Sequence, residues 1–328
     1  MVLTNTTRHL IIDGSAVLYK LFFANKQHKV DDIIALAHIG LLYKIQELYI
    51  KYDIDNIAVV FDCYNRSWRK VYTSRHNVDK ITHKPYKGGR RENMTPSEKK
   101  KIEAFDEHLY IFADFFRTQT TILSLIGDYL EADDIIAGYV QRFNKDDHVI
   151  YSADKDFLQL INTIDGTVTL VESQKDTERN LNDWNGDPEL FLFEKCFRGE
   201  GRGGDNVQSA YPRLLKTKIH KAYTDSFLYN TIINNKFDVG DIDSMGNAVV
   251  YTYNTGDLLK ENKLLMGLNH QPPPIRELID CAIDDAIGNV GKFDYVKFLK
   301  FCHRQGIDRV IKEKDKFIEI LNKGYTCV

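Results

Sequence analysis

The first half of the chain alternates short apolar runs with longer segments in which apolar residues recur at helical spacing. Four runs read as buried strands, namely His9–Ile12, Ile57–Phe61, Thr121–Ile126 and His148–Tyr151. Between them, three segments show the period of an amphipathic helix: Asp31–Lys51, Ser97–Thr118 and Glu131–Phe143. Strands that alternate with helices predict an α/β fold with a mostly parallel central sheet and helices on both faces.

The second half of the chain follows a different pattern. Strand signals thin out after Gly199 and helical patterns dominate, for example from Val296 to Ile320, while Pro272–Pro274 marks a rigid break. A length of 328 residues fits two packed units. We therefore expect an α/β domain over residues 1–200 and a smaller, mostly helical C-terminal domain over residues 201–328.

The bulk composition is that of an ordinary globular protein, with 43% hydrophobic and 28% charged residues. No apolar run approaches the roughly 20 residues of a membrane helix, and the polar segment Met1–His9 does not resemble a signal peptide. The 5 cysteines are scattered without a CxxC pair, which favours free thiols in a reducing compartment over a cysteine zinc site. These features predict a cytoplasmic protein.

The net charge of −3 conceals a strong local asymmetry. Between Arg66 and Lys101 there are 12 Lys or Arg against 3 acids, a local charge of +9, so the rest carries 32 bases and 44 acids, or −12. Such a stretch is either a solvated loop or a binding segment for an anionic partner.

Acidic residues follow the predicted strands at four separate junctions. The seven carboxylates are those of Asp13, Asp62, Glu131, Asp133, Asp134, Asp154 and Asp156. Taken singly, each is explained as a turn cap or as a complement to a helix dipole. All four junctions, however, lie at the carboxyl edge of a parallel sheet, where ligands bind. We therefore expect the acids to converge there.

Converging carboxylates repel one another unless cations neutralise them. Mg²⁺ prefers oxygen ligands, uses a few carboxylates and keeps several waters. No histidine pairs with these acids at a metal-ligand spacing, which argues against zinc. An acidic metal site in the same chain as a basic segment favours phosphodiester hydrolysis, with Lys and Arg holding the phosphates.

Four motifs resemble one known family. They are Leu10–Ala24, the Glu-Ala-Asp-Asp of Glu131–Asp134, Ser152–Phe157 and the Gly-Asp-Asn-Val of Gly204–Val207. Together they resemble the flap endonuclease/5′→3′ exonuclease family, within which the T-even bacteriophage ribonuclease H looks most similar. The resemblance extends weakly to Leu259–Asn262 and the helical tail. It implies the 5′-nuclease (PIN-like) α/β fold.

The resemblance also implies a metal site with two Mg²⁺ ions, for which Mn²⁺ would substitute. The implied ligands of the first ion are Asp13, Asp62, Glu131, Asp133 and Asp154. Asp156 and Asp205 would lie towards the second ion, with Glu200 in place of a further family aspartate. Asp134 is either a ligand or an outer partner. The glycines around Asp205 belong to this motif and not to a nucleotide-binding loop.

The basic segment resembles the family's arch. Tyr86–Arg90 is similar to its Tyr-Lys-x-Asn-Arg motif, which implies that Lys87 and Arg90 reach the scissile phosphate from an insertion at about residues 63–105. Further nucleic-acid contacts are implied for Trp68, Arg69, Arg91, Lys216 and Lys218. For Trp68, stacking on a base and packing under the arch are both open.

The resulting hypothesis is a nuclease that hydrolyses phosphodiesters near 5′ ends and flaps of DNA or RNA–DNA duplexes, as in primer removal during replication. The C-terminal domain would bind DNA, and a single-stranded DNA-binding protein or sliding clamp would be a partner. We expect a monomer without membrane contact, in the cytoplasm of an infected bacterial host. The alternatives are a catalytically weak junction-binding protein with the same fold, and a PIN-like ribonuclease.

Overall fold

A computed structural model describes residues 6–25, 27–64, 66–74, 77–88, 94–200, 206–242 and 247–326. The chain divides into two compact units, which are described separately. Unit 1 comprises Met1–Asn65, Met94–Asn180 and Pro274–Val328, and unit 2 comprises Arg66–Asn93 and Leu181–Pro273. A domain boundary near residue 200 stays a prediction.

Unit 1 is built on a six-stranded sheet with the order β3-β2-β1-β4-β5-β6. The strands are β1 (Arg8–Asp13), β2 (Asn56–Val60), β3 (Leu123–Leu125), β4 (Asp147–Ser152), β5 (Val168–Glu172) and β6 (Thr177–Arg179). The first five pair in parallel and β6 pairs antiparallel with β5. The predicted mostly parallel sheet is confirmed. The sequence pattern did not predict β5 and β6, because β5 is only half-buried in its first two residues and β6 is not buried.

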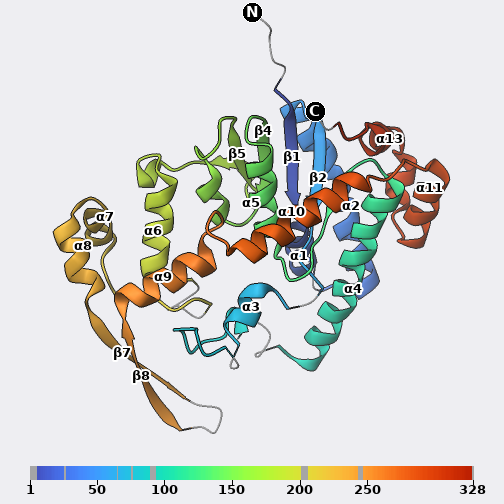
Figure 1. The fold of residues 1–328 in the computed structure, drawn as a ribbon. Helices are drawn as coiled ribbons and strands as arrows, with labels where there is room; N and C mark the ends of the chain where they lie inside the picture. The colour runs from blue at the N-terminus through green and yellow to red at the C-terminus, as the bar shows by residue number, and fades with distance from the viewer. Residues whose placement is uncertain are drawn as a thin grey trace, which may run out of the picture. The chain divides into compact units, whose positions relative to one another are not determined.

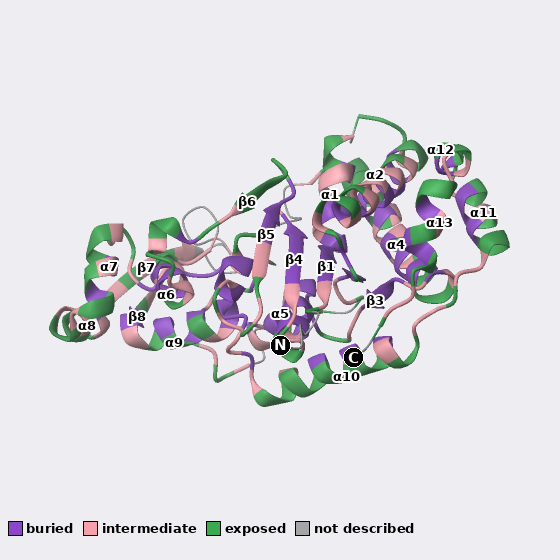
Figure 2. Cartoon of the chain, turned by 90° about the horizontal axis from the view of Figure 1, so that it is seen from above, coloured by how far each residue is buried: buried purple, intermediate pink, exposed green. Residues whose placement is uncertain are grey.

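Helices cover both faces of this sheet (Figure 2). On one side lie α1 (Gly14–Ala24), α2 (Val30–Tyr52) and α4 (Pro96–Gln119). On the other side lies α5 (Ala132–Arg142), with α10 (Pro273–Gly288) packed against it. The close approach of α10 requires a glycine, because a Cβ atom at Gly138 would lie 2.2 Å from Ile279 Cγ2. The predicted helices are confirmed with small shifts at their ends.

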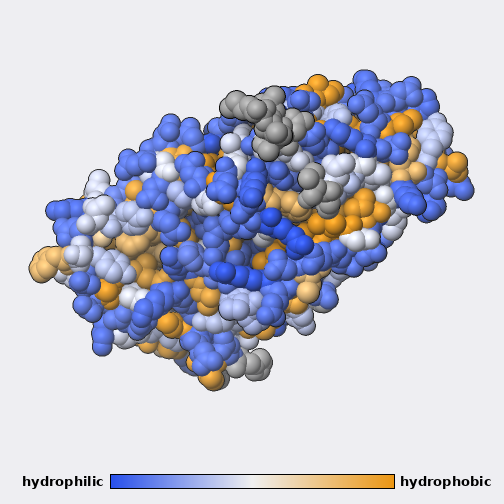
Figure 3. Space-filling model, turned by 45° about the horizontal axis from the view of Figure 1, so that its top comes forward, coloured by the Kyte–Doolittle hydropathy of each residue, from blue (hydrophilic) through white to orange (hydrophobic). Residues whose placement is uncertain are grey.

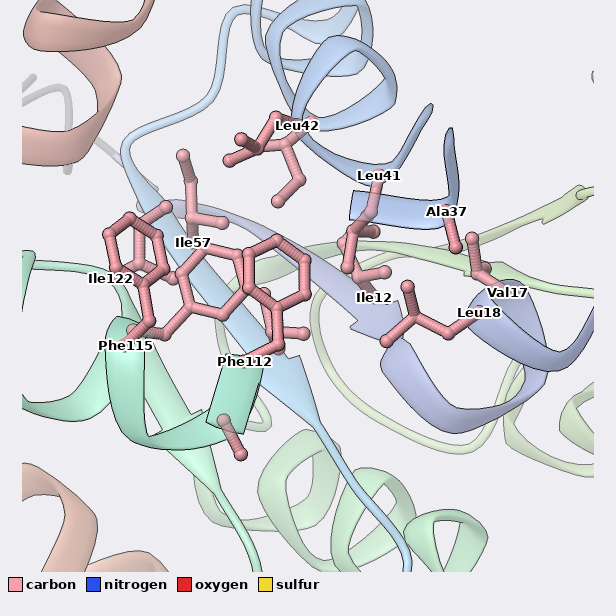
Figure 4. Close-up of a cluster of buried hydrophobic side chains, with 14 of the residues drawn as sticks. Ile12, Val17, Leu18, Ala37, Leu41, Leu42, Ile57, Phe112, Phe115 and Ile122 are labelled. Atoms are coloured by element: carbon pink, nitrogen blue, oxygen red, sulfur yellow. The ribbon is translucent and has the colours of Figure 1, made fainter. Parts of the chain in front are cut away.

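The main core lies between the sheet and the first group of helices. Figure 4 shows Ile12 and Ile57 from the strands, Leu41 and Leu42 from α2, and Phe112 and Phe115 from α4. Residues of the C-terminal helices belong to the same cluster, and Phe115 stacks on Phe301 with ring centroids 4.0 Å apart. The C-terminal tail therefore completes this core.

The predicted helical tail is divided into α11 (Tyr295–Arg304), α12 (Asp308–Lys312) and α13 (Asp315–Asn322). The turn after α11 contains Gly306 with a φ of 65°, a left-handed conformation that glycine adopts without strain. The tail keeps its helical period because each short helix still buries one apolar face, with Phe317 fully buried on α13.

In the described part of the chain, α2 is the one helix long and apolar enough to cross a membrane by length and composition. Eight of its residues are buried, and seven of these belong to the core cluster, which accounts for its composition. On the face drawn in Figure 3, hydrophobic residues form separate groups among hydrophilic ones.

Unit 2 contains α3 (Trp68–Tyr72), α6 (Pro188–Arg198), α7 (Lys216–Thr224), α8 (Ser226–Ile233) and α9 (Thr255–Met266). It also contains the antiparallel hairpin of β7 (Lys236–Ile242) and β8 (Ala248–Asn254), coloured orange in Figure 1. The helical expectation missed this hairpin. Only Tyr253 of β8 is buried, so the strand lacks the apolar run that marks a buried strand.

We expect Phe301→Ala to destabilise the protein by about 3–5 kcal/mol, because it opens a cavity between α11 and α4. Val296→Ala on the same helix is the matched control, since Val296 is 58% exposed and its truncation should cost less than about 0.5 kcal/mol. Urea denaturation followed by circular dichroism measures both. Equal stabilities of the two variants would show that the tail is not part of the core.

Candidate metal centre

The carboxyl ends of the parallel strands carry the acidic residues of unit 1. Asp13 is the last residue of β1 and the N-cap of α1, and Asp62 follows β2 by two residues. Glu131 is the N-cap of α5, while Asp154 and Asp156 follow β4. Because β1 to β4 are adjacent and parallel, these residues emerge at one edge of the sheet.

Two serine hydroxyls connect these junctions. Ser152 Oγ donates to Asp13 Oδ2 at 2.7 Å and accepts the backbone N–H of Asp154 at 3.0 Å. Ser15 Oγ accepts the backbone N–H of Asp62 at 2.9 Å. The end of β4 is thereby tied to the end of β1, and the first turn of α1 to the end of β2.

Sequence reasoning assigned no role to Ser15 or Ser152, although both lie inside the motifs that carry the resemblance. A signal was present, because each serine lies two residues from an aspartate, Ser15 after Asp13 and Ser152 before Asp154. Without the sheet order, nothing in the sequence shows that Ser152 reaches the aspartate of another strand.

The start of α5 joins the same network. Asp62 Oδ1 accepts the backbone N–H of Ala132 at 2.8 Å. Glu131 and Asp134 form a capping box, in which the backbone N–H of Glu131 donates to Asp134 Oδ2 at 3.2 Å. Asp134 is fully buried, and this position favours a supporting role over that of a ligand. Asp133 is half-buried in the first turn.

Asp13 shows the electrostatic consequence of this crowding. Burial, with a smaller contribution from the charges of Asp62 and Asp154, raises the pKa of Asp13 from 3.8 to about 7. The hydrogen bonds from Ala16 and Ser152 act in the opposite direction. The three aspartates therefore lie close enough to repel one another, and a cation among them would relieve the repulsion.

The chemistry of the donor set fits a hard cation. The converging side chains are carboxylates, without histidine or cysteine among them, as Mg²⁺ prefers and zinc does not. Among the described residues, no three His, Cys, Asp or Glu side chains already surround a common metal position. Several carboxylate oxygens are occupied by protein donors here, and Mg²⁺ usually completes its shell with water.

The predicted residues of unit 2 occupy several different environments. Lys87 has a left-handed φ of 53°, and its Nζ lies 4.7 Å from the centroid of the Tyr86 ring. Glu200 pairs with Val207 through backbone hydrogen bonds. Lys218 is exposed on α7. Arg90, Arg91 and Asp205 were also predicted, and they lie outside the described residues.

Three other predicted nucleic-acid contacts have protein partners. Trp68 is 6% exposed and Arg69 is 1% exposed, and Arg69 Nε donates to the carbonyl of Leu265 at 2.7 Å. Lys216 Nζ lies 3.5 Å from Glu194 and 4.6 Å from the centroid of the Trp184 ring. Burial of Trp68 and Arg69 favours packing over contact with nucleic acid.

We expect Asp13→Asn to stabilise the metal-free protein in EDTA at pH 8. A pKa raised from 3.8 to about 7 corresponds to roughly 4 kcal/mol, from which the loss of one hydrogen bond subtracts about 1–2 kcal/mol. Because the folded pKa is the higher one, the contribution of Asp13 to stability should fall as pH rises from about 4 to 7 and then level off, so the stability that Asp13→Asn gains over wild type should grow through this interval.

Denaturant titrations of Asp13→Asn and wild type from pH 4 to 8 measure this difference in stability. The exposed Asp128→Asn is the control and should keep the wild-type profile. A stability difference between Asp13→Asn and wild type that stays constant or shrinks as pH rises through this interval would contradict the proposed crowding.

Comparison with known proteins places the fold. The family model described as 5′-3′ exonuclease, N-terminal resolvase-like domain, matches residues 8–185, more than half of the chain. No curated protein sequence matches. The structure is similar to a bacteriophage T5 protein co-crystallised with metal ions, with TM-score 0.60 and 18% identity over 86% of this chain and 99% of that one.

Two further bacteriophage T5 structures each have TM-score 0.58 and 17% identity, with the same coverage of 86% and 99%. One is the flap endonuclease in a pseudo-enzyme–product complex with DNA and metal ions, and the other is the 5′-exonuclease with zinc bound. These likenesses agree in fold with the match to the family model. The chain belongs to the 5′→3′ exonuclease family and is therefore a nuclease.

Proposed function

We propose that this nuclease is a Mg²⁺-dependent 5′→3′ exonuclease and flap endonuclease with activity on RNA–DNA hybrids. It hydrolyses phosphodiesters near the 5′ ends of DNA or RNA–DNA duplexes and flaps. The observation that carries the proposal is the hydrogen-bonded network that joins Asp13, Asp62, Asp154 and the start of α5 at one edge of the sheet.

Two divalent ions are proposed for this site. Residues for the first are Asp13, Asp62, Glu131, Asp133 and Asp154, and for the second Asp156, Asp205 and Glu200. When bound, such ions supply a water nucleophile at neutral pH and neutralise charge on the leaving oxygen. The T5 proteins crystallised with metal ions support the proposal by similarity of fold.

The protein's own side chains orient this site. Ser152 holds the Asp13 carboxylate and the backbone of Asp154 in a fixed relation. Asp134 is an outer partner that fixes the start of α5, where Glu131 and Asp133 are presented. Such supporting hydrogen bonds commonly change metal affinity by about 10–100-fold.

The basic residues are proposed to bind the substrate backbone. Lys87 and Arg90 contact the scissile phosphate, and Arg91, Lys216 and Lys218 contact neighbouring phosphates. Trp68 and Arg69 are instead assigned to packing, because both side chains are buried.

The motifs resemble those of T-even bacteriophage ribonuclease H, and on this basis we propose that the protein removes primers during replication. It would act as a monomer in the cytoplasm of an infected bacterium. A single-stranded DNA-binding protein or a sliding clamp is the proposed partner. The T5 complex with DNA supports DNA as a substrate class.

Asp154→Asn should lower the cleavage rate by about 100-fold or more, because the metal site loses a charge. The assay uses a 5′-labelled flap and a 5′-labelled RNA–DNA hybrid, with Mg²⁺ or EDTA. Wild type should release short 5′ products only with Mg²⁺, and the exposed control Asp165→Asn should behave like wild type. Tight binding that is indifferent to Mg²⁺, without cleavage, would instead indicate a junction-binding protein.

Lys87→Ala should raise the KM for the flap substrate by about tenfold and reduce the slope of log KM against log salt by about 1. Steady-state kinetics at several KCl concentrations measure both quantities. Lys300→Ala, which removes an exposed cation on α11, is the control. A KM and salt slope equal to those of wild type would remove Lys87 from the proposed substrate contacts.

A further inference from the structure

Two consecutive residues of α9, Glu261 and Asn262, are polar and almost completely buried, with exposed fractions of 3% and 1%. The proposed reaction assigns neither of them a role. Buried polar groups are costly unless they are hydrogen-bonded. Their partners therefore identify the parts of unit 2 that each residue holds.

The Glu261 carboxylate holds the basic segment by accepting hydrogen bonds from backbone N–H groups of that segment. Its Oε1 accepts the N–H of Ile81 at 2.5 Å and the hydroxyl of Tyr72 at 3.3 Å. Its Oε2 accepts the N–H of Thr82 at 2.7 Å. Burial raises the pKa of Glu261, and the two backbone N–H groups act in the opposite direction.

Other contacts join the same segment to the hairpin. His83 Nε2 lies 2.7 Å from Asp241 Oδ2 of β7, and its ring stacks on Tyr251 of β8 with centroids 3.8 Å apart. Within the segment, the backbone N–H of Tyr86 donates to Thr73 Oγ1 at 2.8 Å. The chain that leads to Lys87 is thus held at Thr73, before the residues that contact Glu261, and at His83 and Tyr86, after them.

Asn262 holds a different part of unit 2. Its Nδ2 donates to the carbonyls of Cys196 and Gln208, both at 2.8 Å. Glu200 and Val207 pair through their backbones. Cys196 lies before Glu200 in the chain, and Gln208 directly follows Val207. Asn262 therefore fixes the chain on both sides of that pair.

We infer that Glu261 and Asn262 are positioning residues of the nuclease. Glu261 fixes the part of the basic segment that leads to Lys87, and Asn262 fixes the chain at the candidate metal ligand Glu200. Because Glu261 and Asn262 are adjacent on α9, this one helix positions both Lys87, the proposed phosphate-binding residue, and Glu200, the candidate metal ligand. The inference rests on the proposed function for the roles of Lys87 and Glu200.

Glu261→Gln tests the first half. The amide keeps one acceptor oxygen and turns an NH₂ group towards a backbone N–H, so one of the two amides loses its partner. Hydrogen exchange of the Ile81 and Thr82 amides should accelerate by about tenfold or more. The KM for the flap should rise by about tenfold with kcat within about twofold of wild type.

A double-mutant cycle asks whether Glu261 acts through the segment of Lys87. If it does, Glu261→Gln should add no more than about twofold to the KM of Lys87→Ala. The exposed Glu277→Gln is the matched control and should change neither exchange nor KM. Should Glu261→Gln fail to fold, Glu261→Asp keeps the charge, shortens the reach, and should produce the same changes.

Asn262→Ala tests the second half. It should raise the Mg²⁺ concentration for half-maximal cleavage by about 10–100-fold and leave the exchange of the Ile81 and Thr82 amides unchanged. Asn289→Ala, at an exposed asparagine, should keep the wild-type Mg²⁺ dependence. Hydrogen exchange of residues 206–210 should accelerate in Asn262→Ala even without metal or substrate.

Unchanged amide exchange in folded Glu261→Gln, or an effect on KM that multiplies with that of Lys87→Ala, would overturn the role of Glu261. Unchanged Mg²⁺ dependence would overturn that of Asn262. Failure of the proposed function is a separate result, in which wild type cleaves neither substrate with Mg²⁺. The exchange measurements would then still decide whether the two residues hold these segments.

Discussion

Electrostatic repulsion among the carboxylates at the sheet edge is the constraint on which the candidate site depends. Burial and the charges of Asp62 and Asp154 raise the pKa of Asp13 to about 7. Protein donors oppose part of this effect, namely the Ser152 hydroxyl and the N–H of Ala16. Donors alone do not neutralise several carboxylates, so the edge is organised for cations.

Unit 2 meets a different constraint, since polar contacts hold the part of its basic segment that leads to Lys87, in addition to the packing of Trp68 and Tyr86. Glu261 accepts two of its backbone N–H groups, and His83 stacks on Tyr251 of the hairpin. Hydrogen bonds to buried charged groups are stronger than neutral ones, at about 1.5–3 kcal/mol each. One buried carboxylate on α9 therefore has a large effect on a segment almost 180 residues earlier in the chain.

The sequence predicted the elements whose pattern reflects burial. Strands β1 to β4 are apolar runs that are buried on both faces, and α2 and α4 bury one face in the core. It did not predict β5, whose first two residues are only half-buried, or β6 and the hairpin of β7 and β8, which are short or largely exposed. Burial generates the periodic signal, so weakly buried strands leave little of it.

The sequence by itself determined the α/β class, the acidic residues at four strand ends and the family, because strand ends and motif spacing are local properties. Only the tertiary structure decided which partners these residues have. It joined Asp13 to Ser152 across adjacent strands, buried Asp134 in a cap, and turned Trp68 and Arg69 inward. Such pairings depend on strand order and helix packing, which bring together residues far apart in the chain and leave no periodic trace in the sequence.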